Sequence, residues 1–292
     1  MKWPDDWTSS IRREMPIGSL TTLKVGGVAA YAFFPRDERD LAAQLRWCHE
    51  EGLPVRVLGH GSNVLVGDER FAGAVVCMRG LKGLRVDGTR VTARAGSSLP
   101  NVIAKTLAQG LTGLETLVGI PASLGGAVRM NAGGRYGSVS DRLVRVRGVA
   151  LDTGRVIERS REQCAFGYRR SNLDRLVVTE ATFELEPGDA TAAKTRARDI
   201  FTEKRAAQPL REATAGCVFK NPPGESAGRL VEAAGLKGVR EGGAEVSPHH
   251  ANFIVTGPDA RARHVRTLID RMRSAVVERS GHELELEIEV WS

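Results

Sequence analysis

One cysteine of this chain lies in a setting that could serve chemistry. Cys217 is part of the stretch AGCVFKNP, where Gly216 precedes it and Lys220 follows three residues later. A lone cysteine is commonly a small core hydrophobe. A thiol at a glycine turn can also be presented to a bound molecule, where its reactivity depends on its exposure and surroundings. The stretch alone leaves both interpretations open.

Two glycine-rich stretches could bind an anion. The first, LGHGSNVLV, contains Gly59 and Gly61, but it lacks the third glycine of a dinucleotide fingerprint and strand residues follow it. A Rossmann fold is therefore not expected. The glycines still allow backbone N–H groups to approach an anion, and Ser62 and Asn63 add short donors. The tract 119–126 has the same character, so together the two loops could bind the two phosphates of a dinucleotide. Each by itself could be an ordinary tight turn.

Hydrophobic periodicity and turn residues predict the elements that carry these stretches. A strand, a glycine loop and a second strand are expected over 54–68, and a hairpin around Asp87-Gly88 over 84–96. Helices are expected at 37–52, 97–110, 190–209, 226–238 and 259–282, and further strands at 143–151 and 176–186. The tract 119–138 is poor in charge and rich in small apolar residues, which favours ordered loops over a disordered linker.

Length and composition describe an ordinary globular protein. The chain has 292 residues, 41% of them hydrophobic and 26% charged, which allows one large domain or two modest ones. The residue pattern changes at Pro187-Gly188, from strand-like stretches to a polar helix, which predicts a domain boundary between about 187 and 207. No apolar run approaches the ~20 residues of a membrane span, and the start MKWPDDWTSS does not resemble a secretory signal. The four cysteines show no metal-ligand spacing and suit a reducing cytoplasm, so no metal site is expected.

The charge balance favours anionic partners without identifying one. Net charge is +7 and the pI is about 9.5. The basic residues are scattered, aromatic residues make up only 5%, and no Lys/Arg tail is present. A generally basic surface is the first interpretation, a phosphate-rich small ligand the second, and nucleic acid the third.

Seven stretches in order along the chain resemble one enzyme family. They are TTLKVGGVAAYAFFP (21–35), LGHGSNVLVGDERFAG (58–73), GIPASLGGAVRMNAGGRYG (119–137), FGYRRSNL (166–173), AGCVFKNP (215–222), AGLKGVREGGAEVSPHHANFIV (234–255) and LELEIEV (284–290). Together they resemble UDP-N-acetylenolpyruvoylglucosamine reductase, the FAD enzyme of peptidoglycan precursor synthesis. Only about 48 residues separate Arg169 from Cys217, which resembles the compact variant without an inserted substrate-capping loop.

The resemblance implies an α+β fold. It implies a two-part FAD-binding region of the p-cresol methylhydroxylase type over 1–190, with subdomains of about 1–70 and 71–190. A smaller α+β substrate-binding domain would cover 205–286. Residues 287–292 would form a C-terminal strand that returns to the active site.

The resemblance also implies the reaction and its partners. NADPH would reduce noncovalently bound FAD, and UDP-N-acetylglucosamine enolpyruvate would be reduced to UDP-N-acetylmuramate. The enzyme would be cytoplasmic and serve cell wall biogenesis, and thereby cell shape and division. No nucleic acid, membrane or required protein partner is implied.

Three residues match the catalytic positions of the family. Arg169 would hold the substrate carboxylate with its planar fork, with the neighbouring Arg170 as the alternative. Cys217, where the family usually has serine, would donate a proton to C2 of the enolpyruvyl group. Glu287 would be the catalytic carboxylate. The run ELELEIEV alternates strictly, which predicts a strand with Glu283, Glu285, Glu287 and Glu289 on one face, so a register error would select Glu285 or Glu289.

The binding residues implied by the resemblance fall in two sets. The cofactor set is Gly59, His60, Gly61, Ser62, Asn63, Val64, Leu65, Gly119, Ile120, Pro121, Ala122, Ser123, Gly125, Gly126 and Ala127. The substrate set is Tyr168, Lys220, Asn221, Ser247, His250 and Asn252. Within the second set, His250 could instead be a core histidine with satisfied hydrogen bonds.

Two other function classes remain open from the residues. One is a different flavoprotein on the same FAD scaffold, such as an oxidase. The other is a nonenzymatic protein that binds a nucleotide or a nucleic acid, which the pI favours and the lack of an aromatic platform disfavours.

Overall fold

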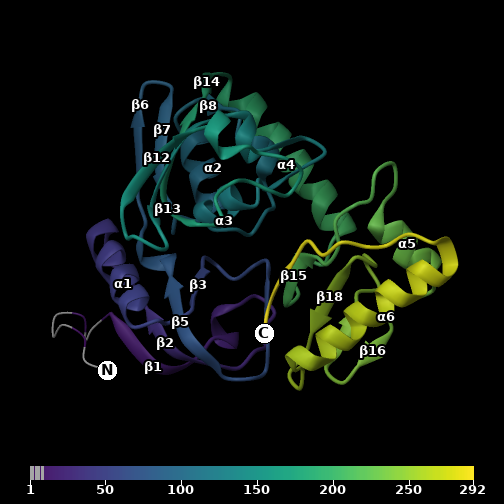
Figure 1. Ribbon diagram of the computed structural model, residues 1–292. Helices are drawn as coiled ribbons and strands as arrows, with labels where there is room; N and C mark the ends of the chain where they lie inside the picture. The colour runs from purple at the N-terminus through teal and green to yellow at the C-terminus, as the bar shows by residue number, and fades with distance from the viewer. Residues whose placement is uncertain (1–2, 4–6, 8–9) are drawn as a thin grey trace. The chain divides into compact units, whose positions relative to one another are not determined.

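The computed structural model describes Trp3, Trp7 and residues 10–292 (Figure 1). These residues form two compact units. The first unit contains Trp3, Trp7 and residues 10–15, 29–60 and 72–202, and the second contains 16–28, 61–71 and 203–292.

The division between the units differs from the expected domains. The chain leaves the first unit between residues 202 and 203, inside α4 (Ala190–Ala207) and inside the predicted range of 187–207. The stretches 16–28 and 61–71 were expected in the FAD-binding region over 1–190, but they cluster with the second unit. The reason is their apolar side chains, because Leu23, Val25 and Leu65 belong to the hydrophobic core of that unit.

One sheet of the first unit carries the first glycine loop. Its strands are β1 (Ile11–Pro16), β2 (Val28–Phe33), β5 (Phe71–Cys77) and β3 (Val55–Leu58), in the order β1-β2-β5-β3, and β3 runs parallel to β5. Helix α1 (Glu38–Glu50) connects β2 to β3. It begins where the Asp37 side chain accepts the Asp40 backbone N–H at 2.8 Å, and Gly52 follows with φ +65°. The predicted helix over 37–52 and the strand before the glycine loop are confirmed.

The other sheet of the first unit is antiparallel. Its order is β12-β11-β13-β7-β6, formed by β12 (Val156–Ser160), β11 (Leu143–Ala150), β13 (Leu176–Glu184), β7 (Arg90–Arg94) and β6 (Leu84–Asp87). The predicted hairpin is confirmed, with Gly88 at φ +57° in its turn. Helix α2 (Leu99–Ala108) follows this hairpin, and α3 (Leu124–Arg129) packs against β13 and β7.

The tract 119–138 differs from the expected loops. It contains α3 and the short paired strands β9 (Gly133–Gly134) and β10 (Gly137–Ser138). The helix forms because Ser123 caps its first turn, the Ser123 hydroxyl accepting the Gly126 N–H at 3.3 Å. Two further short strands, β8 (Leu111–Thr112) and β14 (Glu186–Pro187), pair with each other.

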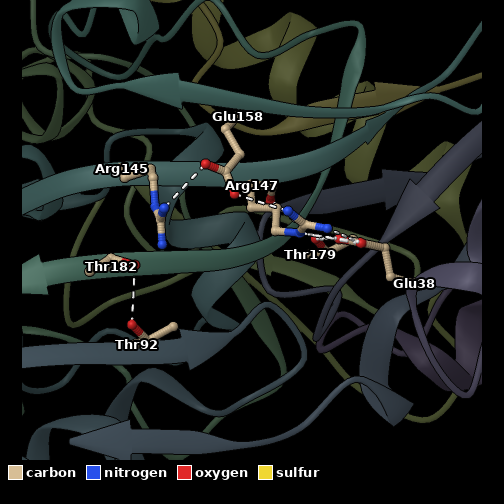
Figure 2. Close-up of polar contacts among 7 residues, drawn as sticks. All are labelled: Glu38, Thr92, Arg145, Arg147, Glu158, Thr179 and Thr182. Atoms are coloured by element: carbon tan, nitrogen blue, oxygen red, sulfur yellow. Dashed lines mark hydrogen bonds and ion pairs between the residues drawn. The ribbon is translucent and has the colours of Figure 1, made fainter. Parts of the chain in front are cut away.

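An ion network joins α1 to the antiparallel sheet (Figure 2). The Arg147 guanidinium donates to the Glu38 carboxylate from Nη2 at 2.8 Å and from Nε at 3.0 Å, while its Nη1 donates to Glu158 at 2.9 Å. The Thr179 hydroxyl donates to Glu38 at 2.8 Å. Burial opposes ionisation of Glu38, but these hydrogen bonds and the charge of Arg147 outweigh it and lower the pKa of the carboxyl.

The second unit contains a four-stranded antiparallel sheet. Its order is β15 (Thr214–Cys217), β18 (Phe253–Thr256), β17 (Ala244–Val246) and β16 (Arg240–Glu241). Helix α6 (Ala262–Ser280) packs against this sheet and against α5 (Ala227–Ala233). Its predicted apolar stripe is buried, as expected: Val265, Leu268, Ile269, Met272 and Val276.

A parallel strand pair in the second unit joins residues far apart in the sequence. Strand β4 (Val64–Val66) pairs with β19 (Glu289–Trp291) in the register Val64 to Glu289. In the same stretch, the Asp68 carboxylate accepts the N–H groups of Ala262 and Arg263, each at 2.9 Å, and so caps α6. Within residues 10–292 we find no helix long and apolar enough to cross a membrane.

Candidate functional site

The predicted site residues are distributed over both units. In the first unit, Gly59 and His60 follow β3, and their carbonyl oxygens accept hydrogen bonds from Arg79, Nε to Gly59 at 3.3 Å and Nη2 to His60 at 3.1 Å. Among the residues that the structure describes, the backbone N–H groups of Gly59 and His60 find no acceptor. Burial, and after it the charge of Arg79, lowers the pKa of His60, so its imidazole is neutral near pH 7.

The second glycine tract offers a similar set of donors in the same unit. Gly125 donates its N–H to Ala95 O at 2.9 Å, which fixes the start of α3. Within the described part of the chain, no acceptor is found for the N–H groups of Gly119, Ala122 and Ser123. Pro121 has no N–H to satisfy. The tract therefore holds three backbone donors, and two of these residues, Ala122 and Ser123, are buried.

The structure brings the two glycine loops of the first unit together. A Cβ atom at Gly59 would lie 2.1 Å from the Ser123 Oγ, a separation that real Cβ atoms essentially never show. Any larger residue at position 59 would therefore force the Ser123 hydroxyl or one of the loops to shift. Five backbone N–H groups of these two loops, from residues 59, 60, 119, 122 and 123, have no acceptor among the residues that the structure describes. Such a donor set fits the diphosphate of a dinucleotide such as FAD, because backbone N–H groups in glycine-rich turns form anion-binding concavities.

The remaining residues of the first predicted loop lie in the second unit. Gly61 is buried with φ +69°, and a Cβ there would lie 2.6 Å from Leu20 O. The Asn63 side chain was expected to face an anion, but its Nδ2 donates to the Glu287 carbonyl at 3.1 Å. Val64 and Leu65 are core residues of β4, 8% and 1% exposed. The cofactor role predicted for these residues stays a prediction.

Arg169 lies in a two-residue turn of the first unit. Gly167 and Arg170 bridge the turn through N–H···O bonds of 3.1 and 3.3 Å, and Arg169 has φ +54°. The Arg169 Nη2 donates to Gly133 O at 2.8 Å, and its guanidinium lies 5.1 Å from the centre of the Tyr168 ring. Non-glycine residues rarely adopt this backbone conformation, and such residues cluster at functional sites. The Arg170 side chain instead folds back against Gly167, which favours Arg169 of the two.

Cys217 differs from the other cysteines in its exposure. It ends β15 after Gly216 at φ +82°, where the ladder with β18 is irregular, and its side chain is partly exposed. The other three are buried, and burial raises the pKa of Cys48 and of Cys77 to about 12. This partial exposure favours a thiol presented to a bound molecule over a core residue, and the role of Cys217 stays a prediction.

The C-terminal segment departs from the predicted strand. Leu286 forms an isolated bridge with Phe219, the chain bends at Glu287 and Ile288, and only Glu289–Trp291 is a regular strand. The bend occurs because the N–H groups of both Glu287 and Ile288 converge on Val218 O, at 2.8 and 3.4 Å. This interruption of the pleat separates the environments of the glutamates that strict alternation had placed on one face.

The surroundings of Glu287 and Glu285 differ. The Glu287 backbone is hydrogen-bonded to Val218, the residue after Cys217, and its side chain is partly buried. Glu285 is exposed and pairs with Lys220, the Lys220 Nζ lying 2.5 Å from its Oε1. Asn63 makes two hydrogen bonds with this segment. Its side-chain amide donates to Glu287 O, and its carbonyl oxygen accepts the Glu289 N–H at 2.9 Å.

Two predicted substrate residues already have partners within the second unit. Lys220 makes the ion pair with Glu285, which leaves its ammonium group partly exposed. The Asn221 Oδ1 accepts the N–H of Ala227 at 3.0 Å, in the first turn of α5. Both residues are held in place next to β15, and their contacts with a substrate remain predicted.

The other predicted substrate residues of this unit are largely buried. The Asn252 amide exchanges two hydrogen bonds with the Phe219 backbone, at 3.0 and 2.8 Å, and Ser247 is fully buried. The His250 Nδ1 accepts the Asn252 N–H at 3.2 Å, and its ring stacks edge-on to Phe253 at 4.9 Å. Burial lowers the pKa of His250. These surroundings favour a positioning role for Asn252 and the core interpretation of His250.

Two residues next to the predicted site were not predicted as site residues from the sequence. Arg79, which orients the carbonyls of Gly59 and His60, stands alone in the sequence between two strands. Asn131 precedes a Gly-rich run, and its φ of +43° is a conformation that asparagine tolerates better than most residues. Among the described residues no group of three or more His, Cys, Asp or Glu side chains could hold a metal ion.

Family models match both parts of the chain. The model described as FAD binding domain covers residues 29–160, and the model of the C-terminal domain of UDP-N-acetylenolpyruvoylglucosamine reductase covers 208–291. An FAD-binding region and a separate C-terminal domain were both expected from the sequence, and their predicted bounds of 1–190 and 205–286 stay a prediction.

Curated relatives and solved structures are similar over almost the whole chain. The UDP-N-acetylenolpyruvoylglucosamine reductase of Moorella thermoacetica is 44% identical over 94% of this chain and 91% of its own length. The enzyme of the same name from Heliobacterium modesticaldum is 42% identical over 98% of this chain and 92% of its own. The crystal structure of UDP-N-acetylenolpyruvylglucosamine reductase from Thermus caldophilus gives a TM-score of 0.85 with 38% identity, covering 97% of this chain and all of that one.

A more distant structure shows the fold alone. Cholesterol oxidase from B. sterolicum gives a TM-score of 0.52 at 19% identity over 64% of this chain and 38% of its own. The FAD-binding fold expected from the sequence is thereby confirmed. From the two family models and the relatives above 40% identity, this chain belongs to the UDP-N-acetylenolpyruvoylglucosamine reductase family of FAD-dependent oxidoreductases.

Proposed function

We propose that this chain reduces UDP-N-acetylglucosamine enolpyruvate to UDP-N-acetylmuramate with NADPH as the reductant and FAD as the cofactor. The observation that carries the proposal is the contact of Gly59 with Ser123, which joins two loops with free backbone N–H donors. The reaction is a step of peptidoglycan precursor synthesis, and we place it in the cytoplasm. It requires a small-molecule substrate and no protein or membrane partner.

The two glycine loops hold the cofactor through its diphosphate. The backbone N–H groups of Gly59, His60, Gly119, Ala122 and Ser123 in the first unit would hold it, because none of them has an acceptor among the described residues. Bound there, FAD would supply the hydride chemistry that links NADPH to C3 of the enolpyruvyl ether. No side chain forms a covalent link in this proposal, so the cofactor is released when the protein unfolds.

Arg169 holds the carboxylate of the enolpyruvyl group. A guanidinium presents a planar pair of donors that matches a carboxylate, and it is charged at every physiological pH. The hydrogen bond to Gly133 O and the Tyr168 ring restrict the guanidinium before a substrate binds. As electrons move toward C2 during the reduction, a fixed cation at the carboxylate stabilises the developing charge.

Cys217 delivers the proton that C2 needs after hydride transfer. Its partial exposure at the end of β15 lets the thiol reach a bound molecule, whereas the other three thiols are buried. A free thiol has a reference pKa near 8.5, which keeps it protonated at neutral pH while making it a better acid than a hydroxyl. The Cys217 Sγ–H bond breaks as the C2–H bond forms.

Glu287 assists this proton transfer from the neighbouring segment. Its backbone is tied to Val218 by a hydrogen bond of 2.8 Å, which keeps the carboxylate near the end of β15. Lys220, Asn221, Ser247, His250 and Asn252 build the surrounding substrate region. Of these, Lys220 is the residue we propose for a direct contact with a phosphate, because its ammonium is partly exposed.

The test uses the purified chain. We expect a yellow protein with about one flavin per chain, released into solution by acid precipitation. NADPH oxidation should depend on the addition of UDP-N-acetylglucosamine enolpyruvate. A colourless protein that binds no added FAD contradicts the cofactor assignment and supports a nonenzymatic nucleotide-binding protein. A flavoprotein that consumes NADPH with oxygen but ignores the enolpyruvyl substrate supports an oxidase on the same scaffold.

A further inference from the structure

We propose that Asn131 is a positioning residue for Arg169. Its side-chain amide fixes the turn that presents the guanidinium, in addition to its backbone role at the end of α3. The inference rests on the proposed function of Arg169, and the experiment below separates the two.

The backbone role of Asn131 accounts for its conformation but leaves its side chain unexplained. Asn131 donates its N–H to Val128 O at 3.0 Å, and Ala132 donates to Ala127 O at 2.8 Å, which is the Schellman pattern of a helix end. The residue at this place adopts a left-handed conformation, and Asn131 has φ +43°. Glycine is the usual residue there, so the helix end alone does not call for an amide side chain.

The buried side chain bridges two other segments of the first unit. Asn131 is 7% exposed, its Nδ2 donates to Gly167 O at 3.0 Å, and its Oδ1 accepts the Ser140 N–H at 3.1 Å. The Gly167 carbonyl is the first peptide group of the turn Gly167–Arg170 and also accepts the Arg170 N–H at 3.3 Å. The amide therefore holds the turn at its base.

Two further bonds attach the same turn to the same stretch of chain. The Arg169 Nη2 donates to Gly133 O at 2.8 Å, and the Ser171 hydroxyl donates to Arg129 O at 2.6 Å. Three hydrogen bonds thus join residues 167–171 to residues 129–133, and Asn131 supplies the middle one. Because Arg169 occupies a backbone conformation that is unfavourable for its type, the turn needs such support to keep one geometry.

This arrangement also connects the Arg169 turn with the glycine tract. Helix α3 (Leu124–Arg129) is capped by Ser123, next to Gly59, and is followed by Asn131, whose amide binds Gly167 O. One short rigid element therefore sets the position of both the backbone donors and the arginine. Displacement of a positioning group by about 1 Å can slow an enzymatic reaction about a hundredfold.

Two substitutions separate the side chain from the helix end. Asn131→Gly keeps the left-handed conformation and removes both side-chain bonds. Asn131→Asp keeps the acceptor for Ser140 but removes the donor to Gly167 O and places a negative charge there. Asn172→Ala is the matched control, because Asn172 is an exposed asparagine just beyond the turn. In Asn131→Gly and Asn172→Ala, we expect flavin content and the unfolding midpoint to stay close to those of the parent, whereas the buried charge of Asn131→Asp should lower the midpoint.

The first readout is trypsin cleavage of the holoenzyme after Arg169 and Arg170, identified by mass spectrometry. Loss of the hydrogen bond to Gly167 O should raise the population of the opened turn, and with it the cleavage rate, by about twofold to tenfold in Asn131→Gly and by at least as much in Asn131→Asp, whose charge repels that carbonyl. The control should cleave at the parent rate. Cleavage rates equal to those of the parent in both Asn131 variants would overturn the proposal.

The second readout is the reduction of substrate by the prereduced enzyme in stopped flow. Both Asn131 variants should be slower by about tenfold to a hundredfold, and much less so when combined with Arg169→Lys, because the lost interaction acts through Arg169. Full additivity in that double variant contradicts the inference. A normal rate for Arg169→Lys alone contradicts instead the proposed role of Arg169, whatever the Asn131 variants do.

Discussion

The contact between Gly59 and Ser123 predicts that adding a single methyl group at position 59 weakens FAD binding. In Gly59→Ala the new Cβ would lie 2.1 Å from Ser123 Oγ and 3.2 Å from Ser123 Cβ. Ser123 is 2% exposed and its hydroxyl caps α3, so it cannot rotate away without losing the bond to Gly126. The substitution must therefore either displace the Ser123 hydroxyl from its cap or push the two glycine loops apart.

The magnitude follows from these contacts. Forcing an extra methyl group into a packed site costs about 1–3 kcal/mol of the free energy of unfolding. If the displaced loops lose one hydrogen bond to a charged phosphate, FAD binding weakens by a further ~1.5–3 kcal/mol, or roughly tenfold to a hundredfold. Ser123→Ala alone should cost about 1 kcal/mol through the lost cap. In Gly59→Ala with Ser123→Ala the closest contact becomes 3.2 Å, so the double variant should bind FAD more tightly than Gly59→Ala alone.

The assay titrates FAD into the apoprotein and follows flavin fluorescence, with urea unfolding of each apoprotein beside it. Gly134→Ala is the control, because a Cβ there meets nothing within 4 Å. A dissociation constant for Gly59→Ala equal to that of the parent would refute the assignment of these loops to the cofactor. Failure of Ser123→Ala to relieve the defect would refute the steric explanation.

Three further outcomes are expected. Cys217→Ala should lose about a hundredfold to ten-thousandfold of the overall rate while NADPH still reduces the flavin, and Cys217→Ser should keep much of the activity. Native rates for both half-reactions of Cys217→Ala in stopped flow would remove the thiol from the mechanism. Arg169→Lys should slow turnover by about a hundredfold to a thousandfold although the charge is kept, and near-native turnover would move the carboxylate contact elsewhere. Burial lowers the pKa of His250 from 6.5, so the unfolded chain binds a proton more readily. The free energy of unfolding, measured in urea, should therefore fall as the pH drops below about 6.5, and less steeply in His250→Gln. An identical slope in that variant would show that other groups cause the dependence.

The sequence predicted local structure well where the pattern was regular. The apolar stripe of α6, the cap of α1 at Asp37 and the hairpin at Gly88 depend on residues close together in the chain, and the structure contains all three. The motif order also indicated the family, which the comparisons confirm. These features are set by short-range spacing, which is visible without a structure.

Features that depend on distant partners were missed. Alternation of Leu and Glu predicted a continuous strand through Glu287, but two N–H groups converge on Val218 O and bend the chain there. Asn63 resembled an anion ligand in its glycine loop, yet its amide binds the Glu287 carbonyl, 224 residues away. Arg79 could not be predicted as a site residue, because its role depends on the carbonyl oxygens of Gly59 and His60, which only the folded chain brings next to it. In each case the deciding partner is remote in sequence.

The parallel pair of β4 and β19 has a consequence for biosynthesis. Strand β4 has been synthesised by residue 66, but its partner β19 ends at residue 291. The stretch 61–71 therefore leaves the ribosome long before the strand that completes its sheet, whereas the strands of the first unit are all complete by residue 187. Such long-range parallel pairing forms slowly and leaves apolar segments exposed meanwhile. We expect the second unit to fold only after translation is nearly finished, and C-terminal truncations to aggregate during expression.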